Sequence, residues 1–440
     1  MEKYDVVIVG ACTAGTYFSS LLAKGGLNVL VIDKDTEENL SKRLDIIHFT
    51  RDSYKDFNIE ESKYGDEEFV RNFEECISKS ALNNHPKKSF TKVSVLHLPL
   101  FIKRLRKKAI ENGATFMFNQ SFDHLTYNES GKIDGIVTKQ GLTIKARLVV
   151  DASGIPSVVR KTIKDPFMET FEIGPRDMFY VLLKYVKLHN PNDEVVLSTS
   201  WPYYKGWIAP QHTKGGAIVG VGANLSLDYA RKCMAKFENA IPLPEYTLQY
   251  EEVGCTPYRR PPFSFVTDNF LVIGDAACLT KPWNGEGIPC CWVLATPAAQ
   301  IVIDALKNNG IASKEALWKI NEIYQKGEGA VYASTRAMLI GAVNMSEKDN
   351  DYMFKHSIVF KGDDEKENPK VVSTLLKGVF KGEFKLKSLL GLISAVSKGS
   401  KLEKHYKNYP SSPEGYIKWV KKAEKLWKKA GSMADCIKDA

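Results

Sequence analysis

The sequence predicts an α/β fold in which a parallel-sheet domain is interrupted by an antiparallel sheet and is followed by a helical region. Residues 4–33, 149–160 and 270–288 each read as a buried strand that ends in a glycine turn before a helix. Residues 167–263 instead alternate aromatic and β-branched residues between turns, which is typical of antiparallel strands. Beyond residue 309, the apolar residues recur at helical spacing.

These observations predict three parts of the chain. A discontinuous, Rossmann-like domain comprises residues 1–164 and 264–330, an antiparallel domain comprises residues 165–263, and a helical, basic C-terminal region comprises residues 331–440.

The first segment, YDVVIVGACTAGTYFSSLLAKGGLNVLVID, predicts a dinucleotide site. Its first strand is continuously apolar, as expected of a parallel strand buried on both faces, and ends at Gly10. A helix and a second strand follow. That strand ends in Asp33, roughly 20 residues past the turn, where a carboxylate can bind a ribose hydroxyl. Backbone N–H groups at the start of the helix would face the pyrophosphate.

The glycine pattern of this turn is imperfect, because a cysteine stands where the second glycine belongs. That glycine allows the backbone to approach the pyrophosphate closely. Cys12 is therefore compatible with pyrophosphate binding only if its side chain points away from the phosphate or if the cofactor lies further out. The alternative is a strand and helix that bind nothing. The candidate binding residues in this segment are Gly10, Cys12, Thr13, Ala14, Gly15 and Asp33.

Between the first two segments, the pattern predicts further strands and helices. We expect strands at 45–50, 93–97, 114–118, 132–138 and 143–151, and helices at 67–78 and 99–112.

The second and third segments read VVDASGIPSVVR and FLVIGDAACLTKPWNGEGI. The order of the three segments resembles the flavoprotein superfamily of aromatic hydroxylases, flavin halogenases and geranylgeranyl reductases. The resemblance covers about residues 1–330 and is strongest for the geranylgeranyl reductase branch. In that branch, G-D-A-A followed by P-x-[TN]-G-[GE]-G-I is typical, and this chain has both patterns at 274–277 and 282–288.

The resemblance implies FAD, not NAD, as the cofactor. By the pattern of this family, Asp275 accepts a hydrogen bond from the ribityl chain. Backbone N–H groups near Gly287 and Ile288, at a helix N-terminus, would face the flavin N1/O2 edge. Gly154, Gly274 and Gly285 complete the implied cofactor-binding set. The alternative is a glycine-rich helix start that serves packing only.

The antiparallel domain, residues 165–263, resembles the substrate half of this family, which implies that it is the substrate domain. In that half a Y-x-W-x-F-P strand lies over the flavin. Here Trp207 and Pro210 match, whereas Lys205 stands at the tyrosine position and Ala209 at the phenylalanine position. Trp207 is either a wall of the substrate cavity or an ordinary core aromatic residue. His97 stands where family members often carry an arginine near the flavin, and is either a cofactor contact or a structural histidine.

Four function classes compete: a flavin reductase, a flavin monooxygenase, a flavin halogenase, and a flavin-bearing binding or electron-transfer protein. The turn Ala152-Ser153-Gly154 lacks the aspartate that serves FAD and NADPH in one-component hydroxylases. Lys205 and Ala209 do not fit the W-x-W-x-I-P strand of halogenases, and the aromatic middle domain disfavours a protein without substrate chemistry.

We therefore expect an FAD-dependent oxidoreductase that reduces carbon–carbon double bonds of an apolar, isoprenoid-like small molecule or lipid by hydride transfer. The alternative is an FAD-dependent monooxygenase or halogenase that acts on an aromatic or polyketide-like substrate. Because no second nucleotide fingerprint is present, the expected electron donor is a protein such as a ferredoxin.

Positive charge is concentrated at the end of the chain. Residues 353–440 carry 19 lysines, no arginine and ten acidic residues, which equals the net charge of +9 of all 440 residues. Such a region indicates an anionic partner, including peripheral contact with a membrane, or simply a solvated face. Its last helix, from Ser412-Pro413, has one aromatic face and six lysines within 418–429. That face either lies on lipid or, as we expect more often, docks on its own protein.

The eight cysteines show neither metal-type spacing nor an extracellular framework, which favours reduced thiols in the cytosol. No metal site or nucleic-acid partner is expected. We also expect no apolar run that approaches the roughly 18 residues of a membrane span.

Overall fold

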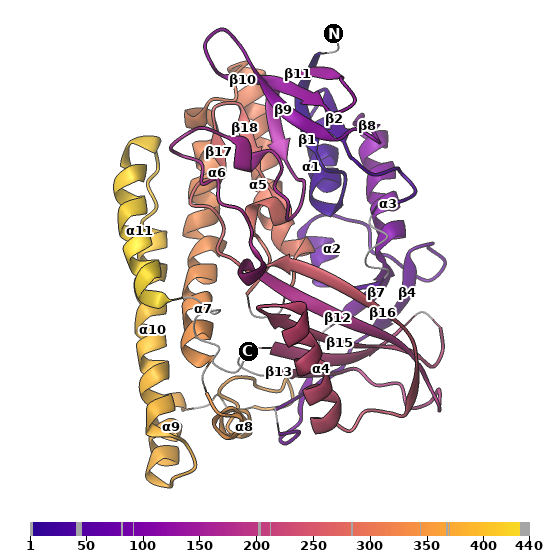
Figure 1. Ribbon diagram of the computed structural model, residues 1–440, viewed down its shortest axis with the longest axis vertical. Helices are drawn as coiled ribbons and strands as arrows, with labels where there is room; N and C mark the ends of the chain where they lie inside the picture. Colours follow the sequence, from indigo (N-terminus) through magenta and orange to yellow (C-terminus); the bar gives the residue numbers. More distant parts are fainter. Residues whose placement is uncertain are drawn as a thin grey trace.

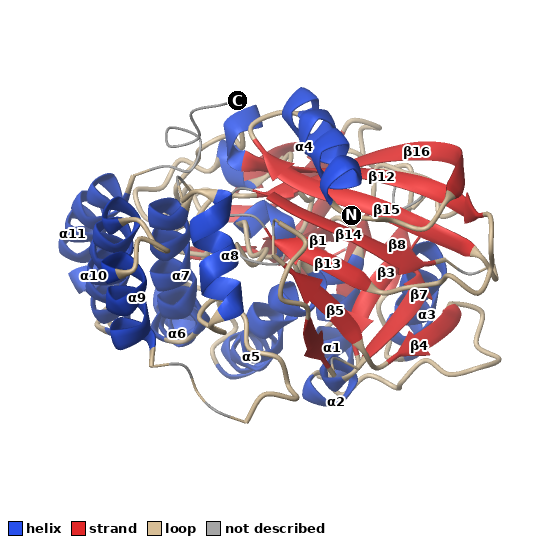
Figure 2. Ribbon diagram, turned by 90° about the horizontal axis from the view of Figure 1, so that it is seen from below, coloured by secondary structure: helices blue, strands red, loops and turns tan. Residues whose placement is uncertain are grey.

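The computed structural model describes residues 3–40, 46–80, 82–90, 92–200, 204–211, 213–282, 285–343, 345–366, 368 and 370–431. Figures 1 and 2 show an α/β domain, a second sheet packed against it, and a layer of long helices on one side. This architecture confirms the predicted fold class.

The first sheet is the predicted parallel sheet, with the strand order β17-β18-β11-β1-β2-β8. The pairs β11/β1, β1/β2, β2/β8 and β11/β18 are parallel, and β9 and β10 extend the sheet beside β11. Val6, Val7 and Ile8 at its centre are buried, as the continuous apolar run predicts. The strands are β1 (Lys3–Val9), β2 (Val29–Ile32), β8 (Thr115–Met117), β9 (Phe122–Tyr127), β10 (Ile133–Thr138), β11 (Thr143–Asp151), β17 (Val266–Thr267) and β18 (Phe270–Val272).

Three helices, α1 (Thr13–Lys24), α3 (Leu98–Glu111) and α5 (Ile288–Asn308), belong to this domain, and α1 packs against both others. Within the described residues, α5 is the one helix long and apolar enough to cross a membrane by length and composition. The expectation that no apolar run approaches this length was therefore wrong. The inner face of α5, including Trp292, Leu294 and Val302, is fully buried, which is also the pattern of a core helix.

The second sheet has the strand order β16-β12-β15-β14-β13-β5-β6. Its pairs are antiparallel except for β13 with β5, which are parallel. Two of its strands, β5 and β6, come from outside residues 165–263. Helix α4 (Leu227–Ala240), which the sequence pattern did not indicate, packs on this sheet. The strands are β5 (Cys76–Lys79), β6 (Lys87–Ser89), β12 (Met178–Leu188), β13 (Leu197–Ser200), β14 (Tyr204–Pro210), β15 (Gly216–Asn224) and β16 (Tyr246–Pro257).

A small third sheet, in the order β3-β7-β4, lies beside the second sheet. Its strands are β3 (Ile46–Thr50), β4 (Phe69–Phe73) and β7 (Val93–His97), and the short helix α2 (Asp52–Asp56) follows β3. The helix predicted at 67–78 is wrong, because β4 and β5 occupy those residues. β4 pairs with β7 and β5 with β13, so partners distant in sequence override the local pattern. The first residue of the strand predicted at 45–50 lies outside the described residues.

The C-terminal region is helical, as predicted. The helices beyond residue 309 are α6 (Lys314–Lys326), α7 (Glu328–Ala342), α8 (Glu347–Lys355), α9 (Val371–Phe380), α10 (Leu386–Lys407) and α11 (Tyr416–Ala430). Tyr416 and Trp419 of α11 are buried, and Trp419 stacks on His405 of α10 with 4.7 Å between ring centroids. The aromatic face of the last helix therefore docks on its own protein, the outcome that we expected more often.

Candidate active site

The carboxyl ends of four parallel strands meet at one edge of the first sheet. Val9 lies beside Asp151 of β11 and Ile32 of β2, and Asp151 lies beside Val272 of β18. The three glycine turns predicted from the sequence therefore converge, with Asp33 directly after β2. In open parallel sheets, this edge is where ligands bind.

The glycines of the first turn allow close contacts between these segments. Gly10 has φ +112°, and a Cβ there would lie 2.3 Å from the carbonyl oxygen of Ala152. A Cβ on Gly15 would lie 2.0 Å from the carbonyl oxygen of Gly10. Gly274, with φ +68°, lies equally close to Ala14, since a Cβ added at residue 274 would lie 2.9 Å from that side chain. These positions need glycine because side chains would separate the turns.

Asp33 and the start of α1 form the other part of this edge. Asp33 accepts hydrogen bonds from the backbone N–H groups of Ala11 at 2.7 Å and Asp35 at 2.9 Å. A carboxylate has about four lone-pair sites, so it keeps capacity for a further donor. Cys12 is exposed at the N-cap of α1, and its side chain does not cap the helix. The helix start can therefore present N–H groups to an anion.

The second turn is organised around the buried carboxylate of Asp151. It accepts hydrogen bonds from Ser153 Oγ at 2.6 Å and from the backbone N–H of Arg160 at 2.7 Å. Ser153 Oγ also accepts from the N–H of Val158 at 2.9 Å. Ser153, which stands where one-component hydroxylases have an aspartate, thus stabilises the turn by hydrogen bonds to both of its ends. Gly154 follows with φ +75°, a conformation that favours glycine.

The third turn places Asp275 among buried neighbours. Burial raises the pKa of this carboxyl to about 6, and the hydroxyl of Thr280, which donates to it at 3.2 Å, offsets part of that rise. A carboxylate in such surroundings is stabilised by a further donor, which a ribityl hydroxyl would supply.

A closed loop leads from this turn into α5. The N–H of Lys281 donates to the carbonyl of Glu286, and the N–H of Gly285 donates to the carbonyl of Lys281. The side chains of Lys281 and Glu286 form an ion pair at 3.0 Å. A Cβ on Gly285 would meet nothing within 4 Å, and one on Gly287 would meet only Thr280 at 3.4 Å. The backbone here borders open space at the N-terminus of α5. Residues 283 and 284 of the sequence motif lie outside the described residues.

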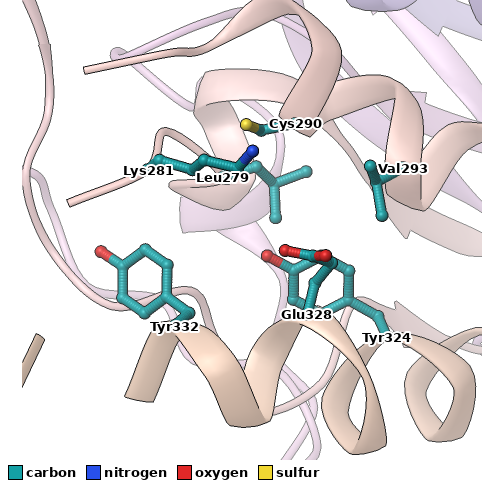
Figure 3. A pocket seen from close by; sticks show the side chains of 7 residues that line it. All are labelled: Leu279, Lys281, Cys290, Val293, Tyr324, Glu328 and Tyr332. Atoms are coloured by element: carbon teal, nitrogen blue, oxygen red, sulfur yellow. The ribbon is translucent and has the colours of Figure 1, made fainter. Parts of the chain in front are cut away.

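A small pocket behind this loop is not the substrate site. Figure 3 shows it between the turn, α5 and the helices α6 and α7, lined by Leu279, Lys281, Cys290, Val293, Tyr324, Glu328 and Tyr332. Its volume of about 10 Å³ is no more than a single water molecule needs. The adjacent Cys290 and Cys291 are both buried, in agreement with a packing role.

The starts of α1 and α5 are tied together by a buried tryptophan. Trp292 Nε1 donates to the carbonyl of Thr13 at 3.2 Å, and its ring stacks on Tyr17 with 4.6 Å between centroids. Both helix N-termini therefore lie at the same edge of the sheet, where their dipoles favour anionic groups.

The loop between Thr280 and Gly287 also contacts the other two sheets. Thr280 hydrogen-bonds Thr256 of β16 at 2.7 Å, and the carbonyl of Pro282 accepts from the hydroxyl of Tyr258 at 2.9 Å. Thr50 of β3 donates to Glu286 at 3.2 Å. The candidate active site thus lies at the junction of the three sheets.

Two titratable side chains at this junction were not selected from the sequence as site residues. Surrounding protein atoms lower the pKa of His48 to about 4 although the residue keeps exposed surface, and the charge of Lys205 adds to the effect. Burial also lowers the pKa of Lys205, against the opposing effects of Cys76 and Glu286. Within the described residues, no hydrogen bond or ion pair is recorded for Lys205 Nζ. The departure of Lys205 from the family's tyrosine was the signal that could have identified it.

Trp207, which was predicted to wall the substrate cavity, lies on the same face of β14 as Lys205 and packs over Gly220 of β15. It adjoins an apolar cluster that contains Leu183, Tyr185 and Ile218. His97 ends β7 beside Ile46 and is the N-cap residue of α3, and its N–H donates to the carbonyl of Glu68 at 2.9 Å. The roles of both residues stay predictions.

The fold and the convergent turns define the class of protein, an FAD-dependent oxidoreductase. Residues 3–252 match the family described as FAD binding domain, and the chain belongs to that family.

The chain is 26% identical over 350 residues to digeranylgeranylglycerophospholipid reductase 1 of Methanosphaera stadtmanae, covering 74% of this chain and 80% of the relative. The structure of a geranylgeranyl bacteriochlorophyll reductase-like protein from Thermoplasma acidophilum superposes with a TM-score of 0.74 at 18% identity, over 91% of this chain and 100% of that one. The myxobacterial chondrochloren halogenase CndH gives a TM-score of 0.62 at 16% identity, over 92% and 97%. At these identities, the two structural matches show the fold alone.

The residues present fit FAD. Asp33 keeps acceptor capacity for a ribose hydroxyl, the two helix starts suit the pyrophosphate and the flavin N1/O2 edge, and Gly285 borders open space. The assignment of each residue to an atom of the cofactor stays a prediction.

Proposed function

We propose that this oxidoreductase reduces carbon–carbon double bonds of an apolar, isoprenoid-like substrate. The observation that carries the proposal is the apolar wall that the second sheet presents beside the loop before α5. Trp207 and Val181 are both half-buried, so they keep apolar surface that a substrate can contact. They lie at the margin of a packed core in which Leu183, Tyr185 and Ile218 of this sheet meet the third sheet. Such a wall suits a hydrocarbon chain and excludes water from it.

The relatives support the same substrate class. The Methanosphaera stadtmanae relative is named a digeranylgeranylglycerophospholipid reductase, and the Thermoplasma acidophilum protein is described as geranylgeranyl bacteriochlorophyll reductase-like. A protein donor such as a ferredoxin is the electron source we propose, because the sequence has one dinucleotide fingerprint only.

When bound and reduced, FAD would supply the hydride, so the chain must deliver a proton to the other carbon of the double bond. We assign this proton to the ammonium of Lys205, because its lowered pKa makes it a better acid than an ordinary lysine. His48, with a pKa of about 4, is neutral near pH 7 and therefore does not serve as the acid. Trp207 would orient the chain of the substrate beside the flavin.

A second candidate, an oxygen-dependent halogenase or monooxygenase, is favoured by one observation. A flavin halogenase needs a lysine in its active site, and Lys205 is a half-buried lysine on the same face of β14 as Trp207. The site does not otherwise resemble the halogenase pattern, because Ala209 replaces the isoleucine of its strand.

One experiment separates the two functions. Enzyme reduced by dithionite without oxygen is mixed with a geranylgeranyl-containing phospholipid, while the visible flavin absorbance and the mass of the lipid are followed. The proposal predicts reoxidation of the flavin together with a gain of two hydrogens per double bond. It is wrong if the lipid is unchanged and a product forms from an aromatic substrate only when oxygen is present.

A further inference from the structure

The helical hairpin of α9 and α10 carries an exposed apolar face that no other part of the described chain covers. Phe380 is 91% exposed, Val372 is 71% exposed, and the remaining members are between 44% and 58% exposed. We define the hairpin face by Val372, Leu376, Phe380, Leu386, Leu390 and Ile393. Within each helix these residues recur every three or four positions, so they form one stripe on each helix.

The opposite face of the hairpin is anchored in the protein. Leu375, Phe384 and Leu389 are buried in a cluster with Tyr352 and Met353 of α8. The hairpin is also held by Asp349, which accepts hydrogen bonds from the N–H of Lys385 at 2.9 Å and the hydroxyl of Ser388 at 2.8 Å. Since the core of the hairpin is complete without them, the exposed residues are not needed for its packing.

Lysines surround the hairpin face. Residues 370–398 contain six lysines (370, 377, 381, 385, 387 and 398) and a single acidic residue, Glu383. Five of the six are exposed, and none is in an ion pair recorded within the described part of the chain. Long lysine side chains can keep their ammonium groups at a polar interface while their stems cover apolar surface.

Figure 1 shows α9 and the adjoining part of α10 at the lower end of the molecule, away from the first sheet. An exposed apolar stripe at such an end, edged by cations, matches an interfacial helix that enters the boundary between headgroups and acyl chains. A protein partner would need matching acidic groups around an apolar groove, whereas an anionic bilayer offers both chemistries everywhere on its surface.

We propose that the hairpin face docks the protein on an anionic lipid surface, with Phe380 and its neighbours entering the bilayer and the lysines contacting lipid phosphates. This moves the expected membrane contact of the basic region from α11, whose aromatic face is buried, to α9 and α10. The inference rests on the exposed face and not on the proposed reaction.

The test measures sedimentation of the full-length, FAD-loaded protein with vesicles of equal parts phosphatidylcholine and phosphatidylglycerol. The triple variant Leu376→Ser, Phe380→Ser, Leu390→Ser should bind at least about tenfold more weakly, since apolar burial drives insertion. Its control replaces Ile110, Tyr127 and Leu248 by serine, three exposed apolar residues elsewhere on the molecule, and should bind within about twofold of wild type.

A second pair of variants tests the charge. Lys377→Gln, Lys381→Gln, Lys385→Gln should weaken binding at least about tenfold and remove most of its salt dependence. The same change at Lys421, Lys425 and Lys428, exposed lysines of α11, should have a much smaller effect. Flavin content and thermal unfolding establish that every variant is folded.

The proposal is overturned if folded wild-type protein does not sediment with these vesicles, or if each variant and its control lose binding equally. It is also overturned if light scattering shows a dimer that the hairpin variants dissociate, because the face would then bind a second copy of the chain. None of these readouts requires turnover, so they are independent of the proposed reaction.

Discussion

The two sides of the candidate site differ in what determines their structure. On the cofactor side, contacts within one short segment shape each turn, as when Asp151 accepts hydrogen bonds from Ser153 and Arg160. On the substrate side, Lys205 and His48 come from strands far apart in the sequence. Burial lowers the pKa of both, and the charge of Lys205 lowers the pKa of His48 further. The comparison teaches that cofactor binding is encoded locally, whereas the chemistry near the substrate depends on how the sheets meet.

The largest effect is expected for a substitution of Lys205, which should impair catalysis without affecting flavin binding. Lys205→Met should lower kcat about 100-fold through loss of the general acid, while flavin content stays at the wild-type level. Turnover and flavin absorbance of purified protein measure both quantities. Lys187→Met, an exposed lysine in the same sheet, is the control and should leave kcat unchanged. A parallel loss of flavin would show that Lys205 belongs to the cofactor side.

The next effect concerns Asp275 on the cofactor side. Asp275→Ala should weaken FAD binding by about 1.5 to 3 kcal/mol, the cost of losing a hydrogen bond to a charged group. Glu286→Ala should weaken it less, because Glu286 pairs with Lys281 and Thr50 and is not assigned to the cofactor. Titration of apoprotein with FAD gives both affinities. Equal affinities would contradict the ribityl assignment.

The pKa of Asp275 predicts a pH dependence on the same side. Without FAD, burial raises this pKa to about 6, and a hydroxyl that donates to the carboxylate should lower it. FAD then binds best to the ionised form, so affinity should fall about tenfold per pH unit below about pH 6. Asp275→Asn should remove this slope. An unchanged slope in that variant would assign the titration to another group.

The smallest effect is expected at Trp207. Trp207→Ala should raise the KM for an apolar substrate several-fold by removing part of the wall, with flavin content unaffected. The matched change Tyr180→Ala, in the same sheet but packed on the cluster with α4 on its other face, should alter KM less. If both variants are equal to wild type in KM, Trp207 is an ordinary core aromatic residue.

The sequence predicted the cofactor side well because its signals are local. The strands, the glycine turns and the helix start at Gly287 follow from runs of apolar residues and from backbone positions that need glycine. Residues 67–78 were assigned wrongly because their strands are stabilised by β7 and β13, which no local pattern reveals. The proximity of His48 to Lys205 could not be predicted from the sequence either, since it depends on the packing of two sheets. The hairpin face also required the fold, because the sequence alone did not show which side of α9 and α10 is covered.

The hydrogen bond from Trp292 to Thr13 has a consequence for the rate at which cofactor binds. It joins the starts of α1 and α5 within the protein itself, so their separation is set when the chain folds. The loss of conformational entropy that accompanies this ordering then occurs during folding and does not oppose binding. Apoprotein should consequently capture FAD in a single fast kinetic phase, without a slow rearrangement after the first encounter.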